Sequence, residues 1–163
     1  MVHIGAGVGY YTAIIAYLVG QAGRVTAIEF DSTLANRAAT NFSNARNVKV
    51  LQGDGFSMPF DAVDVIYVNA GAIDPADIWL DRLNDGGRLI LPLTAQKTLP
   101  PGSAGSIARH GAVFRFERKG DDYLANGSPR SVSTRVKEVA MMHRKLILTA
   151  LSTYRELDGT TQR

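Results

Sequence analysis

The chain has 163 residues, of which 45% are hydrophobic and 20% charged, so it is the length of one domain and has the composition of a globular protein rather than a disordered or fibrous one. It contains no cysteine, which excludes disulfides and thiolate chemistry, and its three histidines match no metal-ligand spacing, so we predict no metal site. The net charge of +3 comes from residues 109–145, where nine Lys and Arg outnumber four Asp and Glu, a pattern more typical of a solvated face than of a nucleic-acid site.

Apolar runs of strand length alternate with helical patterns from residue 1 to residue 93. This alternation is typical of consecutive βαβ units and a mainly parallel sheet. The predicted strands cover residues 2–4, 24–30, 48–52, 62–69 and 88–93. The predicted helices run from Tyr10 to about residue 19, from a cap at Asp31 or Ser32 to about residue 44, and from a first turn containing Pro75 to near residue 83. The apolar face expected on the first helix consists of Tyr11, Ile14, Ile15 and Leu18.

The pattern changes after residue 93. Residues 94–106 carry Pro100 and Pro101 with two glycines, which disfavour a crossover helix, so the next strand should return antiparallel. Residues 112–118 and 123–125 are predicted to form a hairpin at the sheet edge, and a final helix is predicted from Ser131 or Ser133 to about residue 157. We therefore predict one α/β domain over residues 1–163. Residues 1–93 form cofactor-binding βα units in a Rossmann-like, mostly parallel sheet flanked by helices, and residues 94–163 form an antiparallel C-terminal edge hairpin and the last helix.

A glycine-rich turn follows the first strand. Gly5, Ala6, Gly7 and Gly9 lead directly into the first helix. Glycine permits positive φ and leaves no Cβ in the way, so a ligand can lie against the backbone beside the helix N-terminus. A dinucleotide fingerprint that starts at Gly5 needs glycine at position 10, where this chain has Tyr10. The turn therefore indicates a nucleotide-type cofactor and disfavours a nicotinamide dinucleotide.

Two further signals stand at the ends of neighbouring strands. Glu29 ends the second strand, where its carboxylate can accept hydrogen bonds from ribose hydroxyls, and Phe30 beside it can contact adenine. After the third strand comes Gly53-Asp54-Gly55, with Asp54 placed to accept from an adenine amino group. Taken singly, each signal fits a strand-to-helix corner or a helix cap equally well. Their joint order at the carboxyl ends of parallel strands, where open α/β sheets bind ligands, favours a cofactor site.

With these segments the sequence resembles the class I S-adenosylmethionine-dependent methyltransferases, and within them the protein-L-isoaspartate O-methyltransferase group. The resemblance covers roughly residues 2–93, and residues 59–62 and 83–92 are its more group-specific segments. It implies that the glycine turn lines the methionine and ribose part of S-adenosylmethionine, that Glu29 holds the ribose, and that Asp54 with Gly55 holds the adenine. It also implies methyl transfer to a carboxylate.

The sequence departs from that group at several points. His3 stands where such enzymes usually have an acidic residue. Asn69 follows the fourth predicted strand and is expected to face the reaction centre, where it can orient a nucleophile or simply cap the turn. Tyr10 or Tyr11 is expected to point into the site. The group's substrate-recognition segment precedes its first strand, whereas this sequence starts with that strand, so we expect the segment to be missing.

We therefore predict an S-adenosylmethionine-dependent methyltransferase that acts on a carboxylate of the protein-L-isoaspartate type in a small-molecule, peptide or protein acceptor. The candidate catalytic residue is Asn69, and the candidate cofactor residues are Gly5, Ala6, Gly7, Gly9, Tyr10, Glu29, Phe30, Gly53, Asp54 and Gly55. The alternatives are a non-catalytic or degenerate cofactor-binding domain and an NAD-dependent oxidoreductase. Nucleic-acid substrates are disfavoured because no Asn-Pro-Pro-Tyr or Asp-Pro-Pro-Tyr follows the fourth strand. No apolar run reaches bilayer-spanning length and no signal peptide is legible, so we expect a cytoplasmic location.

Overall fold

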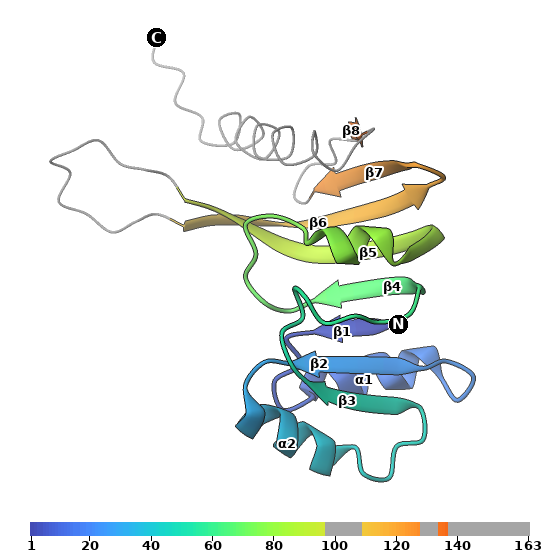
Figure 1. Cartoon of the computed structure of the whole chain (residues 1–163), viewed down its shortest axis with the longest axis vertical. Coiled ribbons are helices and arrows are strands. Elements are labelled where there is room, and N and C mark those ends of the chain that lie inside the picture. Colours follow the sequence, from blue (N-terminus) through green and yellow to red (C-terminus); the bar gives the residue numbers. More distant parts are fainter. Residues whose placement is uncertain (97–108, 128–133, 137–163) are drawn as a thin grey trace, which may run out of the picture.

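The computed structural model describes residues 1–96, 109–127 and 134–136 (Figure 1). Within these residues eight strands form one sheet in the order β3-β2-β1-β4-β5-β6-β7-β8. The first five strands of that order pair in parallel, and β5 to β8 pair antiparallel. This arrangement confirms the predicted α/β class with an antiparallel C-terminal part. The strands are β1 (Val2–Ile4), β2 (Val25–Glu29), β3 (Val48–Gln52), β4 (Val63–Val68), β5 (Leu83–Gln96), β6 (Arg109–Lys119), β7 (Asp122–Gly127) and β8 (Thr134–Val136).

Helices lie on both faces of the sheet. The helices are α1 (Tyr10–Val19), α2 (Ser32–Asn41) and α3 (Asp77–Asp81). The first two connect strands that step from β1 towards β3, whereas α3 connects β4 to β5 in the opposite direction. Because such crossovers are right-handed, α1 and α2 belong to one face and α3 to the other. Figure 1 shows α3 in front of the sheet and α1 behind it, and we call these faces the α3 face and the α1 face.

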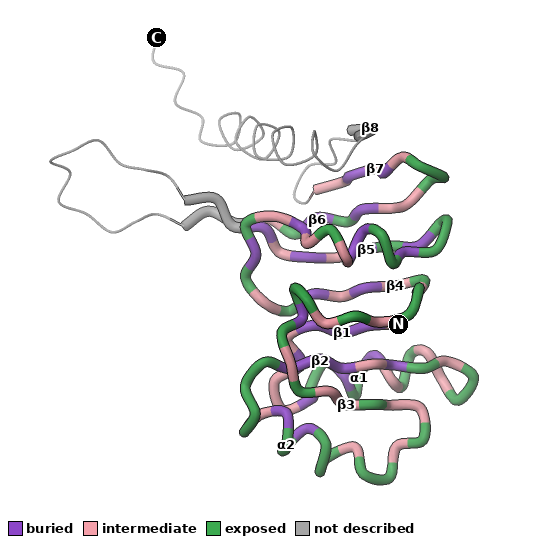
Figure 2. Tube along the Cα trace, in the orientation of Figure 1, coloured by how far each residue is buried: buried purple, intermediate pink, exposed green. Residues whose placement is uncertain are grey.

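The two faces receive different side chains. Residues alternate along a strand, so Val2 and Ile4 of β1 point to the α3 face while His3 points to the α1 face. β1 and β2 are buried along almost their whole length, whereas β3 has no buried residue, as the purple, pink and green segments of Figure 2 show. The main hydrophobic cluster is on the α3 face, and its largest fully buried members are Trp79, Leu80, Leu83, Leu89, Leu91, Phe116, Ile28 and Ile66.

Several predicted boundaries are confirmed and others are wrong. Asp31 caps α2 by accepting from the Leu34 backbone N–H at 2.9 Å, but the helix ends at Asn41 rather than near residue 44. The N-cap of α3 is Ala76, so Pro75 lies outside the helix instead of in its first turn. β5 begins at Leu83, and Gly86, with φ +74°, lies where its register against β4 shifts.

The predicted apolar face of α1 is wrong. Tyr11, Ile14 and Leu18 are exposed, and of the four expected residues only Ile15 is buried, together with Thr12. The sequence of α1 carries no charged residue and one polar one, so its periodicity does not mark a single inner face. The small Thr12 side chain turns towards the sheet because its hydroxyl pairs with buried His3.

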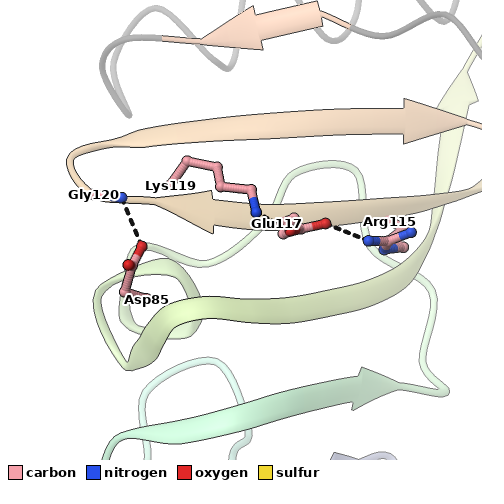
Figure 3. A network of polar contacts seen from close by, with 5 residues as sticks. All are labelled: Asp85, Arg115, Glu117, Lys119 and Gly120. Atoms are coloured by element: carbon pink, nitrogen blue, oxygen red, sulfur yellow. Dashed lines mark hydrogen bonds and ion pairs between the residues drawn. The ribbon is translucent and has the colours of Figure 1, made fainter.

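The antiparallel part confirms the predicted hairpin. β6 and β7 are joined through Gly120 and Asp121, and Gly120 has φ +60°, as a tight hairpin turn requires. The Gly120 N–H donates to Asp85 at 2.8 Å, and Glu117 is held between Arg115 and Lys119 (Figure 3).

The structure corrects the prediction for the segment that follows the hairpin. β8 pairs with β7, so the hairpin is not the edge of the sheet. Thr134–Val136 is a strand, so the prediction of a helix running on from Ser131 or Ser133 is wrong there, and its continuation to residue 157 lies outside the described residues.

No helix in the described part of the chain is long and apolar enough to cross a membrane. Within the same residues, no three His, Asp or Glu side chains gather into a group that could hold a metal ion.

Candidate cofactor site

The turn between β1 and α1 is built by three glycines in the left-handed region. Gly5, Gly7 and Gly9 have φ values of +74°, +57° and +96°, and Gly9 is the N-cap of α1. The backbone N–H groups of Gly5 and Ala6 both donate to the Ile28 carbonyl, at 2.9 and 3.2 Å. The turn is therefore anchored to the carboxyl end of β2.

Each of these glycines has a different neighbourhood. A Cβ on Gly5 would lie 3.0 Å from the Asn69 carbonyl oxygen, and one on Gly9 would lie 2.3 Å from the Phe42 ring. A Cβ on Gly7 would meet no described atom within 4 Å. Packing thus requires glycine at both ends of the turn, while the middle of the turn is open to an approaching ligand.

Glu29 connects β2 to the open part of the turn. One carboxylate oxygen accepts from the Gly7 N–H at 2.7 Å and the other from the Asp31 N–H at 3.0 Å. The residue is only 9% exposed. Two backbone donors fix the carboxylate, and each oxygen keeps a lone pair that can accept a further hydrogen bond.

The Gly53-Asp54-Gly55 turn lies beside Glu29, because the Gly53 N–H donates to the Glu29 carbonyl at 2.9 Å. Asp54 is exposed, and its carboxylate accepts from the Phe56 N–H at 3.0 Å and from the Ser57 hydroxyl at 3.1 Å. This side chain therefore stabilises its own turn and can still accept from a ligand. Gly55 is buried against Ile4, where a Cβ would lie 2.4 Å from a methyl carbon.

Three more predicted residues surround these turns. Tyr10 begins α1 with 69% of its surface exposed, and Phe30 follows Glu29 with 73% exposed. Asn69 directly follows β4, donates its backbone N–H to the Ile4 carbonyl at 2.8 Å, and is exposed. The structure thus brings all the predicted site residues to the carboxyl ends of β1, β2, β3 and β4, at one edge of the parallel sheet.

Beneath the turn lies His3, whose environment the sequence did not reveal. It is fully buried, its Nδ1 lies 2.8 Å from the Thr12 hydroxyl, and its ring centroid is 5.3 Å from that of Tyr67. Among the described residues its Nε2 has no hydrogen-bond partner. Burial lowers the pKa of His3 to about 4 against the opposing effect of the Glu29 charge, so the ring is neutral at pH 7.

Sequence reasoning also missed the support that α2 gives to the turn. Asn41 donates its side-chain amide to the Val8 carbonyl at 2.9 Å, and Phe42 packs under Gly9. Both contacts join residues more than 30 positions apart, so no local sequence pattern predicts them.

Comparison with known proteins identifies the family. The family model described as Protein-L-isoaspartate(D-aspartate) O-methyltransferase (PCMT) matches residues 1–100, which is more than half of the chain. The chain belongs to this family. All the predicted site residues of the PCMT pattern, from Gly5 to Asn69, lie inside the matched region.

Curated PCMT relatives are longer than this chain. Protein-L-isoaspartate O-methyltransferase from Thermotoga maritima is 30% identical over 128 residues, covering 76% of this chain and 37% of that protein. The enzyme of the same name from Rhodopseudomonas palustris is 35% identical over 128 residues, covering 76% of this chain and 52% of that protein. The chain thus spans about a third to a half of the length of these relatives.

Solved structures agree on the fold. A protein-L-isoaspartate O-methyltransferase superposes with a TM-score of 0.66 at 27% identity, covering 90% of this chain and 45% of that one. A Plasmodium falciparum PCMT structure in complex with S-adenosyl-L-homocysteine superposes with a TM-score of 0.54 at 19% identity, covering 85% and 62%. The second likeness is one of fold alone.

Proposed function

We propose that this chain binds S-adenosylmethionine at the glycine turn and transfers its methyl group to a carboxylate of the isoaspartyl type in a peptide or protein. The observation that carries the proposal is the Glu29 carboxylate, fixed by the Gly7 and Asp31 N–H groups beside a turn with open space above Gly7. An acceptor of hydroxyl hydrogen bonds next to unobstructed backbone fits a ribose and an amino-acid tail. Membership of the PCMT family supports the same choice.

Each of three turns would bind a different part of the cofactor. Gly5, Ala6, Gly7 and Gly9 would line its methionine and ribose part, and Glu29 would accept from the ribose hydroxyls. Asp54 and the Gly53 and Gly55 backbone would hold the adenine edge, with Phe30 against the ring. Tyr10, exposed at the start of α1, would close the opposite side. Tyr10 also occupies the place of the third glycine of a dinucleotide fingerprint, which disfavours NAD.

When bound, the cofactor supplies a methyl group on a sulfonium sulfur. Held by the glycine turn and Glu29, the cofactor would supply this methyl group to a carboxylate oxygen of the acceptor, and S-adenosylhomocysteine would be the product that remains. A carboxylate is already ionised near neutral pH, so the residues present need only position it. Asn69 stands beside Gly5 with an exposed amide that can donate to an acceptor oxygen.

Calorimetric titration with S-adenosylhomocysteine tests the cofactor. We expect saturable binding by the wild type and at least tenfold weaker binding by Glu29→Gln, which keeps the shape of the side chain and removes the charge. Asp61→Asn is the matched control, since Asp61 is exposed and outside the site. If the folded protein does not bind S-adenosylhomocysteine, the proposal is wrong. If it binds NADH more tightly, the oxidoreductase alternative takes its place.

Transfer is tested with a radiolabelled methyl donor and two peptides that differ only in an isoaspartyl or a normal aspartyl residue. Labelling of the isoaspartyl peptide alone supports the proposal, and Asn69→Ala should then lower kcat with little change in cofactor affinity. Cofactor binding without labelling of either peptide would instead favour the non-catalytic alternative. The cytoplasmic location and the single domain over residues 1–163 stay predictions.

A further inference from the structure

The side of α1 that faces away from the sheet is almost wholly apolar. Thr12 and Ile15 are buried, while the opposite side of the helix exposes a stripe that we call the outer face of α1. At 100° per residue these side chains fall within one 120° arc, so they form a continuous strip rather than scattered positions. The outer face consists of Tyr10, Tyr11, Ile14, Tyr17 and Leu18, exposed by 69%, 46%, 42%, 85% and 75%.

Such a strip lies at the upper end of the apolar patches found on ordinary monomers. If a fully exposed large side chain offers about 200 Å², the outer face presents on the order of 600 Å² of mostly apolar and aromatic surface. The largest apolar patch on a typical monomer is about 300–600 Å². No Lys, Arg, Asp or Glu occurs anywhere in α1, whereas a helix exposed to water usually carries charge on its outer side. The outer face of α1 therefore has the composition of a covered surface.

We propose that the outer face of α1 is the interface of a dimer formed with a second copy of this chain. Two copies meeting through this face would bury at most about 1,200 Å² in total, which is the lower limit of specific interfaces. A strip without charges can meet its own copy around a twofold axis with no repulsion between like charges. Tyrosines that bury their rings while their hydroxyls reach the rim are typical of interface centres.

With the twofold axis placed perpendicular to α1, the two α1 helices run antiparallel. Ile14 lies midway along the strip and would face its own copy across the axis. Tyr17 and Leu18 would lie towards the ends, over the Tyr10 end of the other helix, next to its glycine turn. The dimer would thus wall off one side of each candidate cofactor site. Tyr10 belongs to both proposals, but the dimer can be tested apart from the proposed function because Ile14, Tyr17 and Leu18 lie outside the cofactor site.

Sedimentation velocity of the full chain from low to high micromolar concentration tests the proposal. We expect a concentration-dependent dimer for the wild type and a shift to monomer, with at least tenfold weaker association, for Tyr17→Lys and for Leu18→Lys. Val113→Lys is the matched control, because Val113 is 50% exposed on β6, away from α1, and should leave the dimer intact. Circular dichroism confirms that each variant is folded.

Cross-linking locates the interface. The chain has no cysteine, so Ile14→Cys introduces one thiol, which a short bismaleimide should join to its copy in the dimer. Val113→Cys should not cross-link. A wild type that is monomeric at every concentration overturns the proposal, whether its α1 lies in water or is covered by another part of the same chain. A dimer that survives both lysine substitutions, or that Ile14→Cys fails to cross-link, also overturns it. Titration of the same variants with S-adenosylhomocysteine separates this result from the fate of the proposed function.

Discussion

The two faces of the sheet carry different kinds of side chain. On the α3 face, β1, β2, β4, β5 and β6 contribute large aliphatic and aromatic side chains that close around Trp79 and Leu80. On the α1 face, the covering helices bring fewer and mostly smaller buried residues, Ala35 and Ala38 from α2 and Thr12 and Ile15 from α1. The same face holds the buried polar residues His3 and Glu29.

This difference separates the side chains that stabilise the fold from those that are placed to bind a ligand. Apolar burial on the α3 face holds the sheet in register, so the strand ends stay fixed. The α1 face has less of that burial, and it carries a carboxylate and an imidazole beneath a turn that three left-handed glycines build. Substitutions on the α3 face should therefore change the free energy of unfolding most, and substitutions near the turn should also change ligand binding.

The largest effect is expected at Trp79. It is fully buried, and its indole N–H donates to the Gly55 carbonyl at 2.7 Å. Trp79→Ala should lower the free energy of unfolding by about 3–5 kcal/mol, since it leaves a cavity and an unpaired carbonyl. Urea unfolding followed by far-ultraviolet circular dichroism measures the loss. Trp79→Phe, which keeps most of the volume and loses only the hydrogen bond, should cost clearly less. Equal losses in the two variants would mean that the cavity is not the cause.

A pH effect is expected from His3. Its pKa in the folded protein is lowered to about 4, mainly by burial, against an ordinary value of 6.5. Between pH 6.5 and pH 4, His3 is therefore protonated in the unfolded chain but neutral in the folded chain. The stability is then full above pH 6.5, falls as the pH drops from 6.5 to 4, and levels off below. The loss is on the order of 3 kcal/mol.

Urea unfolding between pH 7 and pH 4 measures this loss against His3→Gln, which cannot titrate. Among the described residues, the polar and charged groups that face His3 are Thr12, Tyr67 and Glu29. The difference between wild type and variant should grow in the variant's favour as the pH falls. A constant difference would show that the His3 pKa is ordinary.

Part of this arrangement was predictable from the sequence because it is local. The glycine turn, the capping residue Asp31 and the strand that ends at Glu29 each depend on neighbours along the chain. The inner face of α1 was not predictable, because a helix that is apolar all round has no periodic signal. The contact of Phe42 with Gly9 was hidden as well, since only the folded chain brings α2 under the turn.

Gly9 ranks third. Its φ of +96° is strained for any other residue, and a Cβ there would lie 2.3 Å from the Phe42 ring. Gly9→Ala should cost about 1–3 kcal/mol of folding free energy from backbone strain and should weaken S-adenosylhomocysteine binding. In the double variant Gly9→Ala, Phe42→Ala the clash is gone and the strain remains. If the double variant binds more tightly than Gly9→Ala but more weakly than Phe42→Ala, both the clash and the strain weaken binding. If it binds as tightly as Phe42→Ala, the strain contributes nothing.

The smallest effect is expected from Glu117, although it makes the most visible ion pairs. The hydrogen bond from Lys119 is the main cause that lowers the pKa of Glu117, and the nearby Arg115 charge acts in the same direction. A lowered pKa means that any stabilisation exists above the ordinary value of 4.5 and is lost as the pH falls through the folded value. Arg115 and Lys119 are exposed, however, so water competes for both partners.

Glu117→Gln should therefore shift the urea midpoint at pH 7 no more than Asp121→Asn does at the exposed hairpin turn. Phe116, the preceding residue of β6, is fully buried on the α3 face, and Phe116→Ala should unfold at a much lower urea concentration. The two positions are adjacent in sequence, and the strand directs their side chains to opposite faces of the sheet. Comparable losses at both positions would mean that the α3 face is not the main source of stability, and the contrast between the faces would fail.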